Sequence, residues 1–126
     1  MPALDARTTY VHLGEGPEVT LLPVTDDFWS TIADRTDLEG GRLVTSFDQT
    51  EDWKVWEMHP GGDELVYVLA GSVRFHLERG DGVDSADLGP MQYVVVPAGT
   101  WHTADVNEPG QILVITWGEG TTHRPR

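Results

Sequence analysis

The sequence contains no cysteine and few basic residues, and each shortage limits what the protein can do. Without thiols, the chain can form neither a disulfide framework nor a thiolate zinc site, and it offers no cysteine nucleophile. Any metal ion must therefore be held by histidine and carboxylate side chains. Eight basic residues against 21 acidic ones give a net charge of −13, which opposes binding to nucleic-acid phosphates and to anionic lipids. We accordingly expect no nucleic-acid partner and no membrane partner.

Long apolar runs are also absent. The apolar segments fall well short of the roughly 18 residues that a membrane-spanning helix needs, so no span is predicted. Residues 1–13 carry charged side chains and no apolar run, and we therefore expect no signal peptide. The expected location is cytoplasmic.

What the sequence does contain is a rhythm of short apolar segments separated by turns. The 126 residues include 14 glycines and eight prolines, a pattern typical of an all-β sandwich or barrel in a single domain. One short helix is predicted at residues 26–35, where Phe28, Trp29 and Ile32 recur at helical spacing. Strands are predicted at residues 42–47, 53–59, 64–69, 73–78, 91–96, 101–106 and 111–117.

These elements predict a simple organisation. Residues 1–41 are expected to form an amino-terminal extension, with a strand and the short helix packed on a barrel. Residues 42–117 form the barrel itself, and residues 118–126 form a loose basic tail. The strand at 91–96 is apolar on nearly both faces, so we expect it to be covered on both sides.

Four side chains that can bind a metal ion are predicted to converge. Glu57 and His59 lie two residues apart on one predicted strand and share a face, and the turn after them returns Glu64 toward them on the next strand. A second Pro/Gly turn sets His102 at the start of another strand, where it supplies a fourth candidate ligand. Imidazole and carboxylate together suit a divalent ion, and Zn, Mn, Fe and Ni all remain open.

The same residues resemble the two sequence motifs of the cupin family. The first motif is His, one residue, His, three or four residues, Glu, six residues and Gly; the second is Pro, one residue, Gly, two residues and His. The resemblance covers roughly residues 42–117. It implies a double-stranded β-helix, the jelly-roll barrel of the cupins, with one metal ion at its mouth. The matching residues are His59, Glu64 and Gly71 in the first motif, and Pro97, Gly99 and His102 in the second.

The chain departs from the family pattern at two positions. Glu57 stands where the first motif has its first histidine, so the usual set of three histidines and one glutamate becomes two of each. Val106 stands where the second motif commonly has asparagine, and Asn107 comes one place later. Glu57 is therefore either the fourth ligand or a catalytic general base beside an ion that the other three residues hold.

A substrate pocket is predicted beside the ligands. Four side chains lie there by strand parity or by adjacency in the sequence, and they would form a mainly apolar wall. His76, in contrast, lies on the polar face of an alternating strand and is interpreted as a surface histidine. The four predicted pocket residues are Trp53, Val66, Val68 and Trp101.

The leading interpretation is a metal-binding cupin that acts on a small molecule, as a dioxygenase or as an isomerase or lyase. A mononuclear site with open positions can bind both O2 and a substrate, and a metal ion with a carboxylate base can enolise a carbonyl compound. The alternative is a non-catalytic ligand-binding or sensor cupin without a functional metal site. Trp56 and Met58 point away from the ligands and, together with the habit of the family, predict a homodimer.

Overall fold

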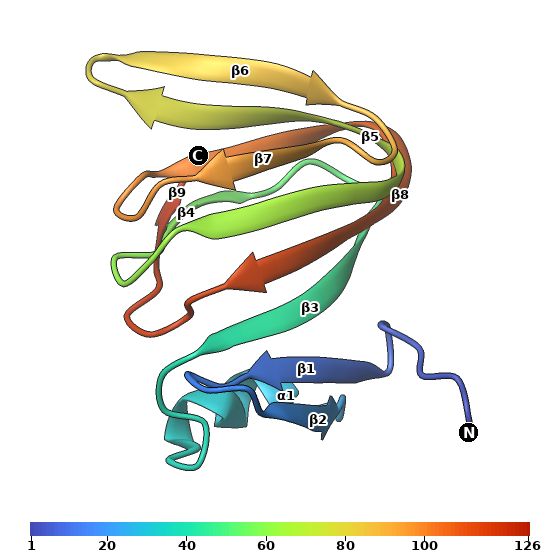
Figure 1. Ribbon diagram of the computed structural model, residues 1–126. Coiled ribbons are helices and arrows are strands. Elements are labelled where there is room, and N and C mark those ends of the chain that lie inside the picture. The colour runs from blue at the N-terminus through green and yellow to red at the C-terminus, as the bar shows by residue number, and fades with distance from the viewer.

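The computed structural model describes residues 1–126 and contains nine strands and two short helical segments (Figure 1). The all-β class with one short amino-terminal helix is therefore confirmed. No helix has the length and apolar character that a membrane crossing needs. In chain order the elements are β1 (Thr9–Leu13), β2 (Val19–Pro23), α1 (Phe28–Thr31), a 3-10 segment (Ile32–Asp34), β3 (Arg42–Gln49), β4 (Val55–Met58), β5 (Glu64–Arg79), β6 (Gly82–Leu88), β7 (Tyr93–Val96), β8 (His102–Thr116) and β9 (Thr122–Pro125).

Two long strands, β5 and β8, form the centre of the barrel. They pair antiparallel along most of their length, from Leu65 opposite Ile115 to Leu77 opposite His102. β6 and β7 pair with β5, and β3 and β4 pair with β8. The remaining strands join through these neighbours, β1 and β2 through β3 and β9 through β4. The barrel core consists of nine buried apolar residues, Val66, Val68, Val73, Phe75, Leu88, Val96, Ala104, Ile112 and Val114.

β5 is one bent strand where the sequence predicted two. Register shifts between Val68 and Val73 bend the strand without ending its pairing with β8. Gly71, at this bend, has a positive φ of 75°, and a β-carbon there would lie 2.4 Å from the carbonyl oxygen of Pro109. Only glycine fits such a close approach in this conformation. The glycine of the first motif thus has a structural role.

The amino-terminal extension continues the sheet of the barrel. β1 and β2 form a hairpin, and β1 pairs with β3, which gives the order β2-β1-β3-β8. A small second core of Tyr10, Leu22 and Phe28 joins α1 to this hairpin. The helix is shorter than predicted, because the hydroxyls of Ser30 and Thr31 bond to the backbone of the first turn and a 3-10 turn follows at once.

The carboxyl-terminal tail is a strand, which corrects the expectation of a loose segment. β9 pairs antiparallel with β4, and Arg124 lies opposite Trp56. The guanidinium of Arg124 lies over the rings of Trp101 and Trp56, 4.5 Å and 5.4 Å from their centroids. It also forms an ion pair with Glu78. These cation–π and charge contacts hold the tail against β4, β5 and the residue that precedes β8.

β7 is covered on one side only, which corrects a second expectation. Val96 faces the barrel core and is 2% exposed. Tyr93 and Val95 lie on the outer face of the strand and are 52% and 48% exposed. β7 therefore presents large apolar side chains to the surface.

Candidate metal centre

Glu57, His59, Glu64 and His102 meet at one end of the barrel. Glu57 lies on β4, directly opposite His102, which is the first residue of β8. His59 follows the end of β4, and Glu64 is the first residue of β5. His59, Glu64 and His102 are buried, and all four side chains offer ligand atoms within 4.8 Å of one another. The convergence that strand parity predicted is therefore present in the fold.

Glycine shapes the turn that brings these strands together. A β-carbon at Gly61 would lie 2.5 Å from the indole ring of Trp117, so the turn can pass this close to the ring only without a side chain. The turn returns Glu64 to within 2.8 Å of His59, measured from carboxylate oxygen to Nε2.

The two imidazole rings are held with Nε2 toward the cluster. The Thr121 hydroxyl donates its proton to the carbonyl oxygen of Gly118 at 2.8 Å, so it accepts a hydrogen bond from Nδ1 of His59 at 2.7 Å. Nδ1 of His102 donates to the carbonyl oxygen of Thr100 at 3.0 Å. In both neutral rings the proton is thereby assigned to Nδ1, and Nε2 presents a lone pair.

Both Nε2 atoms are buried and have no hydrogen-bond partner. Nε2 of His59 lies 2.8 Å from an oxygen of Glu57 and 2.8 Å from an oxygen of Glu64, and Nε2 of His102 lies 3.2 Å from the other Glu64 oxygen. The atoms are close enough for hydrogen bonds, but the direction that a ring N–H needs is not met. The four groups therefore surround a common point.

This arrangement fits a metal ion. When both rings are neutral, the cluster consists of four electron-pair donors without a proton between them, and a cation satisfies such a group. Histidine with carboxylate is an ordinary ligand set for a divalent ion. Atoms bound at about 2.1 Å to one ion lie about 3.4 Å apart in a tetrahedron, so small side-chain rotations would complete the site.

The charges in the cluster are coupled. Burial alone would raise the pKa of Glu64, but the imidazoles of His102 and His59 outweigh it and lower that pKa to about 2. Burial also opposes the ionised form of Glu57, yet the contact with His59 lowers its pKa. Burial disfavours a charged His59 ring, but the two carboxylates raise the pKa of His59 to about 9. In the absence of a metal ion, the two carboxylates thus favour the protonated form of the His59 ring.

The cluster opens into a cavity of about 1000 Å³, which Glu57, His59 and Glu64 line. The rest of the wall is largely apolar and combines barrel strands with the amino-terminal extension. The larger apolar side chains of this wall include Trp29, Leu38, Leu43, Phe47, Trp53 and Trp117.

The predicted pocket residues lie in three different places. Trp53 lines the cavity. Val66 and Val68 point into the barrel, where they are 0% and 1% exposed and belong to the core behind the cavity wall. Trp101 lies under the guanidinium of Arg124 and away from the cavity lining. The contribution of the extension to the cavity was not predicted, because strand parity relates only residues on paired strands.

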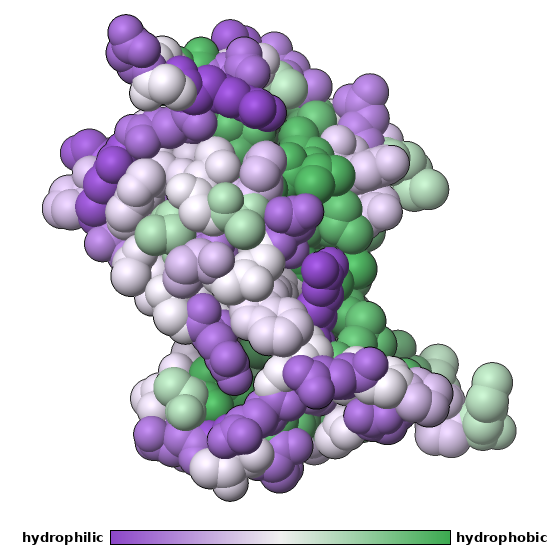
Figure 2. Space-filling view, turned by 60° about the vertical axis from the view of Figure 1, so that its left-hand side comes forward, coloured by the Kyte–Doolittle hydropathy of each residue, from purple (hydrophilic) through white to green (hydrophobic).

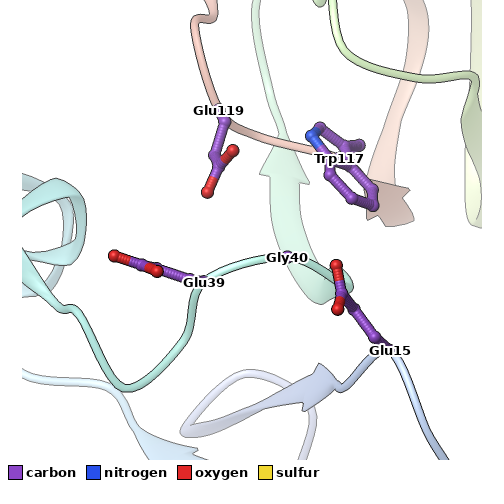
Figure 3. Close-up of a pocket in the computed structure, with 5 residues that line it drawn as sticks. All are labelled: Glu15, Glu39, Gly40, Trp117 and Glu119. Carbon is purple, nitrogen blue, oxygen red and sulfur yellow. The ribbon is translucent and has the colours of Figure 1, made fainter.

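An acidic depression of about 650 Å³ adjoins the cavity (Figure 3). Gly40, Trp117 and Glu119 line both, so the depression lies beside the same opening. Figure 3 shows the side chains of Glu39 and Glu119 extending into the open space, with Glu15 on the other side of Gly40. No basic residue lines the depression, and its field therefore opposes anions.

The tail supplies two residues at the cluster, Thr121 and His123, that the sequence motifs did not indicate. Nε2 of His123 lies 3.1 Å from an oxygen of Glu57. No motif marks either residue. The pairing of β9 with β4 brings them to the cluster, His123 within β9 and Thr121 directly before it. His76 stays outside the cluster, where its ring nitrogens contact Ser85 and Asp105.

Comparisons with known proteins support the fold. The family model of the cupin domain matches residues 44–124. A cupin superfamily protein from Desulfitobacterium hafniense is 23% identical with a TM-score of 0.52, and the match covers 62% of this chain and 68% of that one. Hydroquinone 1,2-dioxygenase PnpCD, in complex with Cd2+ and 4-hydroxybenzonitrile, is 21% identical with a TM-score of 0.51, over 63% of this chain and 59% of that one. Fe(II)-HppE with the alternative substrate (S)-1-HPP is 16% identical with a TM-score of 0.52, and the match covers 60% of this chain and 42% of that one.

At these identities the structural likeness concerns the fold alone. The chain matches about 59% of the length of the dioxygenase and 42% of that of HppE. No curated protein matches the chain. The cupin motifs, the barrel and the family match over most of the sequence agree, and the protein belongs to the cupin family.

Proposed function

We propose that this cupin holds a divalent metal ion between His59, Glu64, His102 and Glu57, and that the ion takes part in binding or converting a small molecule in the adjoining cavity. The observation that carries the proposal is the pair of buried Nε2 atoms without hydrogen-bond partners. When the rings are neutral, each unsatisfied buried nitrogen costs about 1–3 kcal/mol, and a bound cation would offset that cost.

The ligand set suits several ions. Imidazole nitrogens favour Zn, Fe and Ni, whereas two carboxylates add oxygen ligands that suit Mn or Fe(II). The two negative charges of Glu57 and Glu64 would balance a dication. A bound ion with positions open to the cavity would supply a place for a substrate oxygen and would acidify a water molecule.

Glu64 and Glu57 differ in exposure and in contacts, and these differences suit them to different roles at the metal ion. The Glu64 side chain is 3% exposed and accepts a hydrogen bond from the Thr116 hydroxyl at 2.6 Å, as suits a permanent ligand. The Glu57 side chain is 27% exposed, lines the cavity and contacts His123, which is 52% exposed. Glu57 is thus placed to serve as the fourth ligand, or as a general base that takes a proton from the substrate on the solvent side.

The cavity supports a ligand with a large apolar part, because most of its exposed wall is apolar, although Arg35, Arg42 and Lys54 also line it. Among proteins of the same fold, the hydroquinone 1,2-dioxygenase structure contains 4-hydroxybenzonitrile and HppE contains Fe(II). On these grounds we place oxidation of a small molecule by O2 first among the reactions, and metal-assisted isomerisation or a lyase reaction second. This order rests on analogy of fold.

A second candidate function is a metal-free ligand-binding or sensor barrel. His59 favours it, because its pKa of about 9 gives a protonated ring at neutral pH, whose positive charge partly balances the two carboxylates without a metal ion. The two candidates differ in metal content, and elemental analysis separates them.

We expect the protein, after incubation with Zn2+, Mn2+, Fe2+ or Ni2+ and removal of free ions, to retain one ion per chain. His59→Ala and His102→Ala should each weaken binding by more than about 100-fold, because losing a residue that only orients a ligand already costs about 10- to 100-fold. His76→Ala is the matched control and should bind like the wild type. Elemental analysis and competition with a chelating dye measure these affinities. Unchanged retention in either ligand variant would reject the site, and a wild-type chain that binds none of the ions would favour the metal-free candidate.

Thr121→Val should weaken metal binding by about 10- to 100-fold, because Nδ1 of His59 loses the hydroxyl that accepts its proton and orients the ring. Thr121→Ser keeps the hydroxyl and should bind like the wild type. Thr122→Val makes the same change at the next residue, which is exposed, and serves as the control. Competition titrations give the affinities, and circular dichroism checks the fold. Equal metal affinities of the two valine variants would show that Thr121 does not orient His59 for metal binding.

Metal affinity should rise with pH up to about 9. An ion can bind Nε2 of His59 only after the ring loses its proton, and the pKa of that ring is raised to about 9. Below this pH the proton competes with the ion, so affinity should increase about tenfold per pH unit between pH 6 and 8 and level off above about 9. Calorimetric titrations in buffers of different ionisation enthalpy should detect about one proton released per ion at pH 7. Affinity that is flat across this range would contradict the assigned state of His59.

A further inference from the structure

The cavity at the metal cluster extends to the amino-terminal extension. The extension lies below the barrel in Figure 1, and Figure 2 shows that the molecule narrows where these two parts meet. Residues of both parts line the cavity, among them His12 of β1 and Trp29 of α1 on the side of the extension. A ligand that fills this cavity therefore contacts both parts.

One row of side chains on the inner face of the sheet joins His12 to the metal cluster. His12 lies opposite Leu43 of β3, and Leu43 lies opposite Thr116 of β8. The Thr116 hydroxyl donates a hydrogen bond to Glu64 at 2.6 Å, which continues the row to β5. All four residues line the cavity. At about 4.8 Å per strand, the backbones of His12 and Glu64 are about 14 Å apart along the sheet, so His12 lies at the end of the cavity far from the cluster.

Three buried polar residues line the cavity outside the metal cluster. They are His12, Thr45 and Gln49, which are 6%, 3% and 7% exposed. Gln49 has partners at both ends of its amide, because its oxygen accepts a hydrogen bond from Trp53 and its nitrogen donates to the carbonyl oxygen of Asp48. His12 and Thr45, in contrast, each keep a polar atom that no other group of the chain satisfies.

The free atom of His12 is Nδ1. A carbonyl oxygen can only accept, so Nε2, 2.8 Å from the carbonyl oxygen of Gly40, donates that hydrogen bond, and Nδ1 of the neutral ring presents a lone pair. Nδ1 of His12 and the hydroxyl of Thr45 have no partner, yet neither is fully buried, since the fully buried unpartnered atoms are the two Nε2 atoms of the metal cluster. Both residues line the cavity, so the cavity is the space that these two atoms face.

His12 and Thr45 lie close enough to bind one group together. Thr45 is two residues from Leu43, the residue opposite His12, so His12 and Thr45 are diagonal neighbours on the same face of β1 and β3. The backbones of such neighbours lie about 7–8 Å apart, and a single group placed between the two side chains can contact both.

We propose that His12 and Thr45 form a distal site that binds a hydroxyl group at the end of the ligand farthest from the metal ion. A hydroxyl group can donate its proton to Nδ1 of His12 and accept the proton of the Thr45 hydroxyl. A carboxylate has no proton for Nδ1, and an ammonium group has no lone pair for Thr45, so neither group satisfies both residues.

The distal site defines a class of ligand. Its members are elongated, with a metal-binding oxygen at one end, an apolar middle beside Leu43 and a hydroxyl group at the other end. The inference rests on the proposed function for the metal-bound end of the ligand, whereas the distal site itself consists of residues outside the metal cluster.

Aryl hydroxamic acids test the proposal, because the hydroxamate group binds the metal ion and the aryl ring extends along the cavity. The series has zero to three methylene groups between the ring and the hydroxamate, and each member is prepared with and without a para-hydroxyl group. Calorimetric titrations of the protein incubated with Zn2+ should show a hydroxyl preference at one chain length. There the hydroxylated compound should bind at least about 10-fold more tightly than its counterpart, as two hydrogen bonds supply.

Substitutions at the distal site should remove this preference. His12→Gln keeps an N–H for the carbonyl oxygen of Gly40 but removes the lone pair of Nδ1, and Thr45→Val removes the hydroxyl at similar size. Each should reduce the preference to about 3-fold or less, with the affinity for the compounds without the hydroxyl unchanged. Thr45→Ser keeps the hydroxyl and should retain the preference. His76→Gln, the matched control outside the cavity, should retain it too.

A preference that is lost in both His12→Gln and Thr45→Val supports the proposal, and circular dichroism confirms the fold of each variant. A wild type that binds no hydroxylated compound more tightly than its counterpart, or a preference unchanged in either variant, overturns it. Elemental analysis of the same samples separates this result from the metal site. A chain that retains the ion but shows no preference contradicts the distal site alone, and a chain without the ion that still prefers the hydroxylated compound contradicts the metal site alone.

Discussion

Four electron-pair donors, three of them buried, share one small space at the mouth of the barrel, and much of the site follows from this constraint. The proton of each neutral imidazole is committed at Nδ1, to Thr121 in one ring and to Thr100 in the other, so both Nε2 atoms face the carboxylates as acceptors. Without an ion, the cluster relieves the conflict by protonating His59, which is why its pKa is raised to about 9. A divalent ion would relieve it more completely, and its binding would stabilise the folded state.

The barrel and the peripheral segments contribute different parts of this site. Strand ends and turns of the barrel bring the four ligand candidates together. The tail adds Thr121 and His123, which contact His59 and Glu57 from outside the cluster. The amino-terminal extension adds apolar cavity wall and much of the acidic opening. Because the barrel is common to many cupins, the choice of ligand is expected to depend on these added segments.

Much of the fold and the cluster could be predicted from the sequence, for identifiable reasons. Residues two apart on a strand share a face, and a Pro/Gly turn returns the chain, so Glu57, His59 and Glu64 could be placed together without coordinates. Local sequence patterns do not reveal where a strand bends without ending, as β5 does between Val68 and Val73. They also miss a tail such as β9, whose pairing depends on Arg124 meeting Trp56 and Trp101 from distant parts of the chain. β6 was missed because six of its seven residues are exposed and its sequence has no apolar alternation.

The most direct test of the account is the coordination of a metal ion in crystals of the loaded protein, located by its anomalous scattering. The account predicts one ion at the mouth of the barrel, about 2.0–2.2 Å from Nε2 of His59, Nε2 of His102 and an oxygen of Glu64. Glu57 should lie in the same coordination sphere or directly beside it. An ion bound elsewhere on the chain, or bound through Nδ1 of either histidine, would contradict the account.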